Sequence, residues 1–230
     1  MSQGYFVTGT DTGVGKTLAA CALIWALREK HTTVLGMKAV AAGTELDKDL
    51  HPFNADVRAL QEASSFAPPE YEVCPYVMAA PLSPHLAAEL DGFTVQASTI
   101  AAAYQNLAAK ADAVVVEGAG GFCVPLSMNE SGADLAKLLG LPVILVVGMR
   151  LGCLNHAMLT AQAVAAQGLR IAGWVANCID PDMSALDGNI AYLSQQLMQQ
   201  HKAPLLARLP FQANFHAGSA RELATHFKLP

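Results

Sequence analysis

The sequence contains neither a long apolar run nor a run of basic residues. Its longest apolar stretch, residues 142–147, is far shorter than the roughly 20 residues that cross a bilayer, so we expect no membrane partner. The net charge is −5 at pH 7, whereas a surface that binds the phosphate backbone of nucleic acid needs clustered positive charge. We therefore expect no nucleic-acid partner either.

Paired cysteine motifs are also missing. The five cysteines are odd in number and widely spread, and no two of them form a C-x-x-C pair. This pattern indicates neither a disulfide framework nor a zinc site. No basic flank precedes the short apolar run near the N-terminus, so we find no secretory signal. A reducing cytoplasm is the compartment that we predict.

Strand-like and helical runs alternate along the chain. Strands are expected at residues 5–8, 33–40, 113–117, 143–147, 171–176 and 205–209. Helices are expected between most of them, at residues 18–30, 95–110, 133–139, 154–167 and 185–201. The alternation predicts an α/β fold with a mainly parallel, doubly wound sheet and helices on both faces. The apolar content of 53% fits strands that are buried on both sides.

Residues 41–90 depart from this alternation because they are rich in proline. We expect a helix near residues 55–63, followed by an irregular excursion over the end of the sheet that binds ligands. The chain has no internal repeat, low-complexity tract or Gly/Ser linker. Residues 1–230 are therefore predicted to form a single domain.

A glycine-rich loop at residues 9–17 reads Gly-Thr-Asp-Thr-Gly-Val-Gly-Lys-Thr and lies between the first strand and the first helix. Backbone N–H groups of such a loop and the start of the helix attract phosphate oxygens. Lys16 would reach the β- and γ-phosphates, and the Thr17 hydroxyl would hold Mg²⁺. The loop is one residue longer than the usual pattern, and a plain tight turn is the alternative. We predict a site for a nucleoside triphosphate.

The residues that follow the other strands are informative, because ligands bind beyond the carboxyl ends of parallel strands. Glu117 ends the third strand and is followed by Gly118, Ala119 and Gly120. A carboxylate beside a phosphate loop is well placed to bind Mg²⁺, and the glycines let the backbone approach a ligand. The alternative is a solvated glutamate in a turn.

Three further polar residues allow two interpretations each. Lys38 ends the second strand and either stabilises a transferring anionic group or lies at the surface with its ammonium in water. Asp56 is either a metal ligand or a carboxylate at the start of a helix. Asn177 ends the fifth strand, where an amide suits either a purine edge or a turn.

The segment after the fourth strand can bind an anion. Residues 152–155 would open a helix, and the free N–H groups of the first turn could take a carboxylate. His156 follows them, but a lone histidine in a first helical turn more often packs or donates a hydrogen bond. We assign it no catalytic role.

Taken together, these motifs resemble the ATP-dependent dethiobiotin synthetase family, within the P-loop NTPase class. The matching segments are colinear: residues 9–17, 38–43, 54–56, 83–85, 116–121, 142–148, 151–157 and 173–177. A weaker similarity continues at residues 203–206 and 209–211. The Gly-Thr-Asp-Thr loop and the Gly-Cys-x-Asn-His-Ala segment are specific to this family within the P-loop class.

The resemblance implies a ligase that acts on 7,8-diaminononanoate, CO₂ and Mg-ATP. An amine captures CO₂ as a carbamate, the carbamate takes the γ-phosphoryl group, and the second amine closes the ureido ring as phosphate leaves. Both anionic partners must be held in line, because positioning and electrostatics carry phosphoryl transfer. The resemblance also implies a homodimer whose substrate site crosses the interface.

The resemblance further implies a role for each matching residue. Lys16, Lys38 and Thr12 would be the catalytic residues, and Thr17, Asp56 and Glu117 would hold Mg²⁺. The nucleotide would contact Gly13, Val14, Gly15, Lys16, Thr17, Leu18, Asp56, Glu117, Gly118, Ala119, Gly120, Asn177, Pro210 and Phe211. The substrate would contact Thr12, Lys38, Ala42 and, from the neighbouring subunit, Gly152, Cys153, Leu154 and Asn155.

The sequence departs from the family pattern at three positions. Ala39 and Ala42 replace the usual proline and Ser/Thr after the second strand, and loss of the hydroxyl at position 42 removes a hydrogen bond worth about 1 kcal/mol. Gly13 replaces a larger side chain. We interpret these changes as tuning of the site.

Three other classes of nucleotide-binding protein share parts of this pattern. Partition and septum-site ATPases need a lysine near the start of the loop, where this chain has Asp11. Amidoligases of cobyrinate diamide synthesis carry a glutaminase domain, which we do not expect here. A non-catalytic nucleotide-binding module would not need Lys38 and Glu117 at strand ends.

Overall fold

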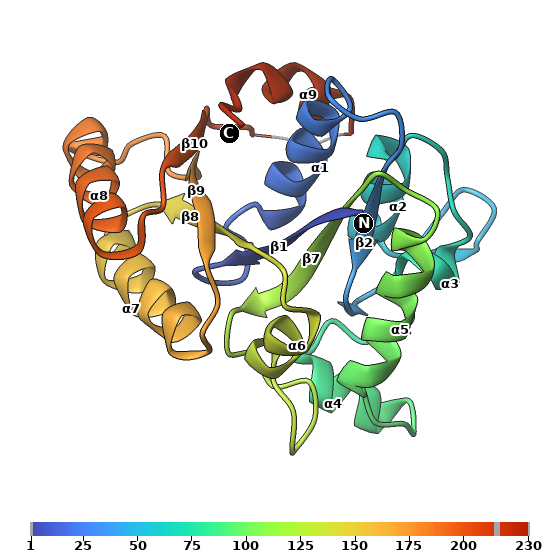
Figure 1. Cartoon of the computed structure of the whole chain (residues 1–230). Coiled ribbons are helices and arrows are strands. Elements are labelled where there is room, and N and C mark those ends of the chain that lie inside the picture. The colour runs from blue at the N-terminus through green and yellow to red at the C-terminus, as the bar shows by residue number, and fades with distance from the viewer. Residues whose placement is uncertain (1, 214–216, 230) are drawn as a thin grey trace.

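A six-stranded sheet forms the centre of the computed structural model, which describes residues 2–213 and 217–229 (Figure 1). Its strands are β1 (Gln3–Gly9), β2 (Val34–Lys38), β7 (Ala113–Gly121), β8 (Val143–Met149), β9 (Ile171–Cys178) and β10 (Leu205–Leu209). They lie in the order β10-β9-β8-β1-β7-β2, and every neighbouring pair is parallel. The predicted doubly wound α/β sheet is confirmed.

Helices cover both faces of the sheet. One face packs against α1 (Lys16–Leu27), α2 (Ala55–Ala63), α3 (Glu70–Val73) and α9 (Ala217–Leu223). The other face packs against α4 (Pro84–Leu90), α5 (Ala97–Ala108), α6 (Gly132–Leu139), α7 (Cys153–Ala166) and α8 (Leu186–His201). The short 3₁₀ helix η1 (Ala224–His226) follows α9. In Figure 1, α1 and α9 lie above the sheet and α6 lies below it.

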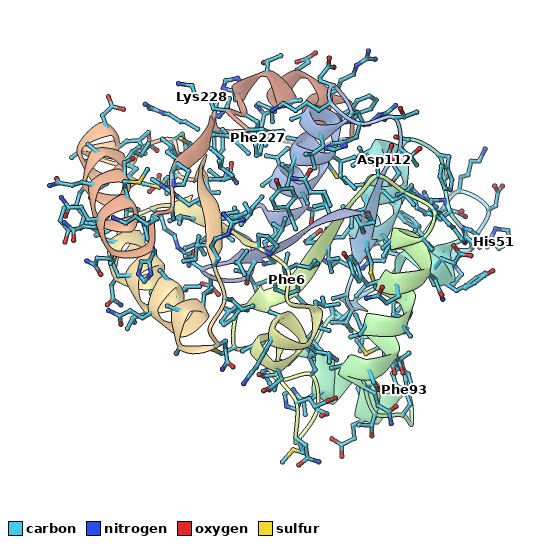
Figure 2. The ribbon with its side chains drawn as sticks, viewed as in Figure 1. Phe6, His51, Phe93, Asp112, Phe227 and Lys228 are labelled. Atoms are coloured by element: carbon cyan, nitrogen blue, oxygen red, sulfur yellow. The ribbon has the colours of Figure 1, made fainter. Side chains whose placement is uncertain are left out.

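The two cores follow from the alternation of side chains along a strand. In β7, Ala113 and Val115 belong to the core under α1, whereas Val114 and Val116 belong to the core under α5 and α6. A strand between two helical layers needs apolar residues at every position, which explains the run of valines in β7. Phe6 of the neighbouring β1 is 2% exposed and lies at the centre of the view in Figure 2.

The proline-rich segment contains more structure than its sequence indicates. The predicted helix at residues 55–63 is confirmed, but the remainder is not irregular throughout. Two short ladders pair β3 (Ala41–Ala42) with β6 (Val77–Met78) and β4 (Glu45–Leu46) with β5 (Pro52–Phe53). Two-residue strands carry no periodicity, and the helices α3 and α4 of this segment are too short for a clear pattern.

Two element boundaries differ from the prediction near the phosphate loop. Helix α1 begins at Lys16, two residues earlier than expected, because Gly15 caps it with a left-handed φ of 84°. Strand β7 continues beyond Glu117, so this residue lies inside the strand and not at its end. Glycines 118, 120 and 121 carry no strand signal in the sequence, yet Gly121 still pairs with Gly9 of β1.

Among the described residues, no helix is both long and apolar enough to span a bilayer.

Candidate active site

The carboxyl ends of the central strands border a cavity of about 860 Å³. Strand β1 lies between β7 and β8. It leads into α1 on one face of the sheet, whereas its two neighbours lead into α6 and α7 on the other face, so the chain diverges at the end of β1. A crevice at such a switch point is where open α/β sheets bind their ligands. The phosphate loop, the ends of β2 and β7 and residues 81–84 of the proline-rich segment all line it.

The phosphate loop is held by glycine conformations and by Asn177. Gly13 and Gly15 have φ values of 73° and 84°, in the left-handed region that favours glycine. A side chain at Gly15 would collide with the Asn177 amide. Asn177 is buried and its Nδ2 donates a hydrogen bond to the Val14 carbonyl at 2.9 Å. In this structure the amide therefore fixes the loop from the end of β9.

Lys16 and Asp11 are joined in the same loop. The Lys16 Nζ donates to the Asp11 carbonyl oxygen at 2.9 Å, and burial lowers the pKa of this lysine. The Asp11 carboxylate accepts from the Thr12 N–H at 2.8 Å and pairs with Arg150 at 2.7 Å. Sequence reasoning missed the pair with Arg150, because nothing local relates residues that are 139 positions apart.

Lys38 lies between two carboxylates. Its Nζ is 2.6 Å from Glu117 Oε1 and 2.6 Å from Asp56 Oδ2. Lys38 and Glu117 are directly paired in the register of β2 and β7, so their side chains leave the sheet on the same face. Asp56 reaches them from the first turn of α2, the helix on that face.

This arrangement decides between the interpretations that the sequence left open. Lys38 is 4% exposed and Glu117 is 0% exposed, so a surface lysine and a solvated turn glutamate are both wrong. Asp56 does lie at a helix start, where Asn54 caps α2 by accepting the Val57 N–H at 3.1 Å. Asp56 also pairs with Lys38. Its position at a helix start is therefore confirmed, and this position is compatible with a role as a metal ligand.

Burial and ion pairing act in opposite directions on these three groups. Burial lowers the pKa of Lys38, but the charges of Glu117 and Asp56 outweigh it, and the net pKa is raised. Burial raises the pKa of Glu117 and Lys38 offsets this only in part, so that pKa also ends above its usual value. For Asp56, burial raises the pKa, but the charge and hydrogen bond of Lys38 lower it by more, so the net pKa is lowered.

The oxygen atoms around Glu117 fit a magnesium ion. Glu117 Oε2 is buried without a hydrogen-bond partner among the described residues, while Oε1 accepts the Thr17 hydroxyl at 2.9 Å. No group of three His, Cys, Asp or Glu side chains in the described chain could hold a metal alone. Two carboxylates and a hydroxyl suit Mg²⁺, which completes its shell with water and substrate phosphates.

Most of the predicted site residues line the cavity. They are Thr12, Gly13, Gly15, Lys16, Thr17, Leu18, Lys38, Ala42, Asp56, Glu117, Ala119, Gly120, Asn177 and Phe211. Within the described chain, the lining does not include Val14, Gly118, Pro210 or the four residues from Gly152 to Asn155. Val14 is buried beneath the loop, and Pro210 is exposed at the surface. Residues 152–155 lie at the start of α7, just beyond the carboxyl end of β8, and only Cys153 of them is buried.

Sequence reasoning assigned no role to several lining residues. They include Asn54, Pro81, Leu82, Ser83, Pro84, Val124, Ile179 and Gln212. The match at residues 83–85 was the available signal for part of this wall, although it carried no chemistry of its own. The Asn54 amide also donates to the Gly43 carbonyl at 2.7 Å, which ties α2 to the segment after β2.

Comparisons with known proteins are consistent with this geometry. A family model described as an AAA domain matches residues 3–218. The chain is 48% identical to the ATP-dependent dethiobiotin synthetase BioD of Nitrosospira multiformis, over 94% of this chain and 92% of the relative. It is 50% identical to the protein of the same name from Ralstonia nicotianae, over 89% of both chains.

Solved structures with the same fold are more distant. A ParA family ATPase from Chlorobium tepidum TLS is similar with a TM-score of 0.55 at 14% identity, over 98% of this chain and 90% of that one. The Cyanthece apo McdA structure gives a TM-score of 0.56 at 13% identity, over 98% and 92% of the two chains. At such identities the likeness concerns the fold alone.

Proposed function

This chain belongs to the ATP-dependent dethiobiotin synthetase family, and we propose that it closes the ureido ring of dethiobiotin from 7,8-diaminononanoate, CO₂ and ATP. The observation that carries the proposal is the buried Lys38 between Glu117 and Asp56, directly beside a phosphate loop. A simple nucleotide-binding module has no need of a second buried lysine at this position.

The reaction joins three components in three steps. One amine nitrogen attacks the carbon of CO₂ and loses a proton, which gives a carbamate. A carbamate oxygen attacks the γ-phosphorus of ATP, and ADP leaves. The second amine then attacks the carbonyl carbon of the mixed anhydride, and inorganic phosphate leaves as the ring closes.

The lysines neutralise the anions that must meet in this reaction. Lys16, in the first turn of α1, binds the nucleotide phosphates together with the loop N–H groups. Lys38 binds the carbamate and the transferring phosphoryl group, where donors in a buried site stabilise developing charge more strongly than in water. Thr12 contacts the amine or carbamate end of the substrate, and Ala42 lies on the same cavity wall.

Thr17, Asp56 and Glu117 are the residues that would hold Mg²⁺. When bound, this ion neutralises phosphate oxygens and holds them in position for the transfer. Glu117 Oε2 supports the assignment, because this buried oxygen has no partner in the described part of the chain.

The adenine is assigned to the part of the cavity near Asn177 and Phe211. Asn177 and Phe211 line the cavity there, and Pro210 precedes Phe211. Gly118, Ala119 and Gly120 provide backbone close to the phosphates, and Val14 offers its N–H group within the loop.

We also infer a homodimer in which Gly152, Cys153, Leu154 and Asn155 bind the substrate carboxylate of the neighbouring subunit. Two observations support this assignment: these residues lie outside the cavity of their own chain, and Leu151 beside them is 95% exposed. We further propose that residues 1–230 form a single domain and that the enzyme is cytoplasmic. The five free cysteines fit a reducing compartment.

The test is phosphate release by the purified protein. With diaminononanoate, bicarbonate, Mg²⁺ and ATP, we expect phosphate release that depends on the diamine, with a ureido product seen by mass spectrometry. Lys38→Ala should nearly abolish turnover while ATP still binds, because Lys16 and the loop remain. Lys110→Ala, which removes an exposed lysine paired with Glu72, is the matched control and should keep full activity.

Two results would contradict the proposal. ATP hydrolysis that is indifferent to the diamine would favour a nucleotide switch. Normal turnover in Lys38→Ala would remove this lysine from the mechanism.

A further inference from the structure

The Lys38 ammonium lies between the two carboxylates that are assigned to the magnesium ion. It lies 2.6 Å from one oxygen of Glu117 and 2.6 Å from one oxygen of Asp56. The Thr17 hydroxyl donates to the same Glu117 oxygen, so two of the three groups assigned to magnesium already bind a positive charge and the third is hydrogen-bonded to one of them.

We propose that Lys38 and a divalent cation bind Glu117 and Asp56 in alternation, so that cation binding transfers Lys38 to the anionic reactants. The proposal rests on the nucleotide and magnesium site of the proposed function. It adds that Lys38 competes with the metal for its ligands and is released only when the metal arrives.

Electrostatics favours the exchange. Magnesium binds carboxylate oxygens at about 2.0–2.1 Å, so an ammonium group on the same oxygens would lie close to the ion and be repelled by it. Glu117 is fully buried and Lys38 nearly so, and repulsion between like charges is weakly screened in such surroundings. Glu117 Oε2, which no described residue contacts by a hydrogen bond, gives an entering cation one oxygen that does not bind Lys38.

The backbone around Lys38 limits where its side chain can move. Lys38 is fixed opposite Glu117 by the register of β2 and β7, and its N-terminal neighbour Met37 is buried. The flexible four-carbon stem of a lysine can still swing its ammonium group within the cavity that Lys38 lines. Thr12 and Ala42 line the same cavity, where the carbamate is assigned.

This exchange has a consequence for the order of events. While Lys38 remains on the carboxylates, it neutralises them and is unavailable to the carbamate. Once the cation takes the carboxylates, the free ammonium group can neutralise the carbamate and the transferring phosphoryl group. The cation would thus control the chemistry through Lys38 as well as through its own charge.

The first experiment measures Mg²⁺ binding by calorimetry to protein saturated with ADP, in the absence of the diamine. Lys38→Met removes the competing charge and keeps the length of the side chain, so Mg²⁺ should bind about tenfold more tightly than to the wild type. Lys110→Met is the matched control, since Lys110 makes an exposed 2.6 Å pair with Glu72, and it should leave the affinity unchanged. Unchanged or weaker Mg²⁺ binding in a Lys38→Met protein with native circular dichroism would overturn the proposal.

The second experiment uses the wild type, so that it does not depend on whether the variant folds. The ¹⁵N resonance of the Lys38 ammonium should shift when Mg²⁺ is added to the ADP complex, because the group leaves its two carboxylates. A resonance that Mg²⁺ does not move would overturn the exchange. Neither experiment measures product, so a protein that shows the exchange but forms no ureido ring would refute the proposed function alone.

Discussion

Asp56 differs from its partners Lys38 and Glu117 in its access to solvent. Its side chain is 43% exposed, whereas those of Lys38 and Glu117 are 5% and 1% exposed. Solvent screens its ion pair, so the stabilisation from Asp56 is smaller than the short distance alone indicates. Glu117 is the opposite case, because its buried charge depends on Lys38 for compensation.

The lowered pKa of Asp56 predicts how this residue affects stability across pH. The ionised carboxylate stabilises the folded chain above the unfolded pKa of about 3.9, and this contribution disappears as the pH falls through the lower folded value. Asp56→Asn should therefore lower the free energy of unfolding at pH 6, and the gap to the wild type should narrow towards pH 3. Urea denaturation of both proteins at pH 6 and at pH 3 measures this difference in the free energy of unfolding. A difference that is larger at pH 3 than at pH 6 would contradict the prediction.

At the level of secondary-structure elements, the phosphate loop depends on a contact from the strand β9. Asn177 at the end of β9 donates to the Val14 carbonyl, and it can lie there only because Gly15 has no side chain. Gly13 has a similar positive φ, but a Cβ atom added there would meet no other atom within 4 Å. A side chain at Gly13 would therefore cause backbone strain alone, whereas a side chain at Gly15 would cause the same strain and also collide with Asn177.

Substitution of these glycines by alanine tests that distinction. Gly13→Ala should cost about 1–2 kcal/mol, because an L-residue is strained in the left-handed region. Gly15→Ala has the same strain and also displaces Asn177, so it should be more destabilising and should weaken ADP binding further. Denaturation midpoints and ADP titrations of the two variants measure the difference. Equal losses would show that the contact with Asn177 is not important.

Across the whole molecule, the start of α7 lies at the same end of the sheet as the phosphate loop but outside the cavity, since Arg150 just before it pairs with Asp11. The cavity opens at the carboxyl ends of the strands, whereas Gly152 to Asn155 do not line it. In Figure 1, α7 lies on the opposite side of the view from α3. The proposed homodimer would bring the start of α7 of one subunit to the substrate of the other.

The shared site predicts that assembly and activity are lost together. The native protein should elute at twice the 24.1 kDa mass of one chain. Leu151→Asp adds a charge to a side chain that is 95% exposed beside Gly152, and it should weaken the dimer and raise the KM for the diamine. Tyr71→Asp on α3, at a side chain that is 72% exposed, is the control. A fully active monomer would refute the shared site.

The α/β fold and the phosphate loop could both be predicted from the sequence. Both depend on local patterns, namely apolar periodicity and glycines at fixed spacing before Lys16 and Thr17, and local patterns can be read without knowing what lies nearby. The same reasoning could not resolve the short ladders at residues 41–42 and 77–78, because two residues carry no period.

Only the tertiary structure could decide between the interpretations that the sequence allows for Lys38, Glu117 and Asp56. Lys38 and Glu117 are 79 positions apart and meet because β2 and β7 are neighbours in register, while α2 brings Asp56 to the same face. Strand order and burial are properties of the whole packed chain. They bring three ambiguous residues into one pair of ion pairs, in which Lys38 and Glu117 are buried and Asp56 is partly exposed.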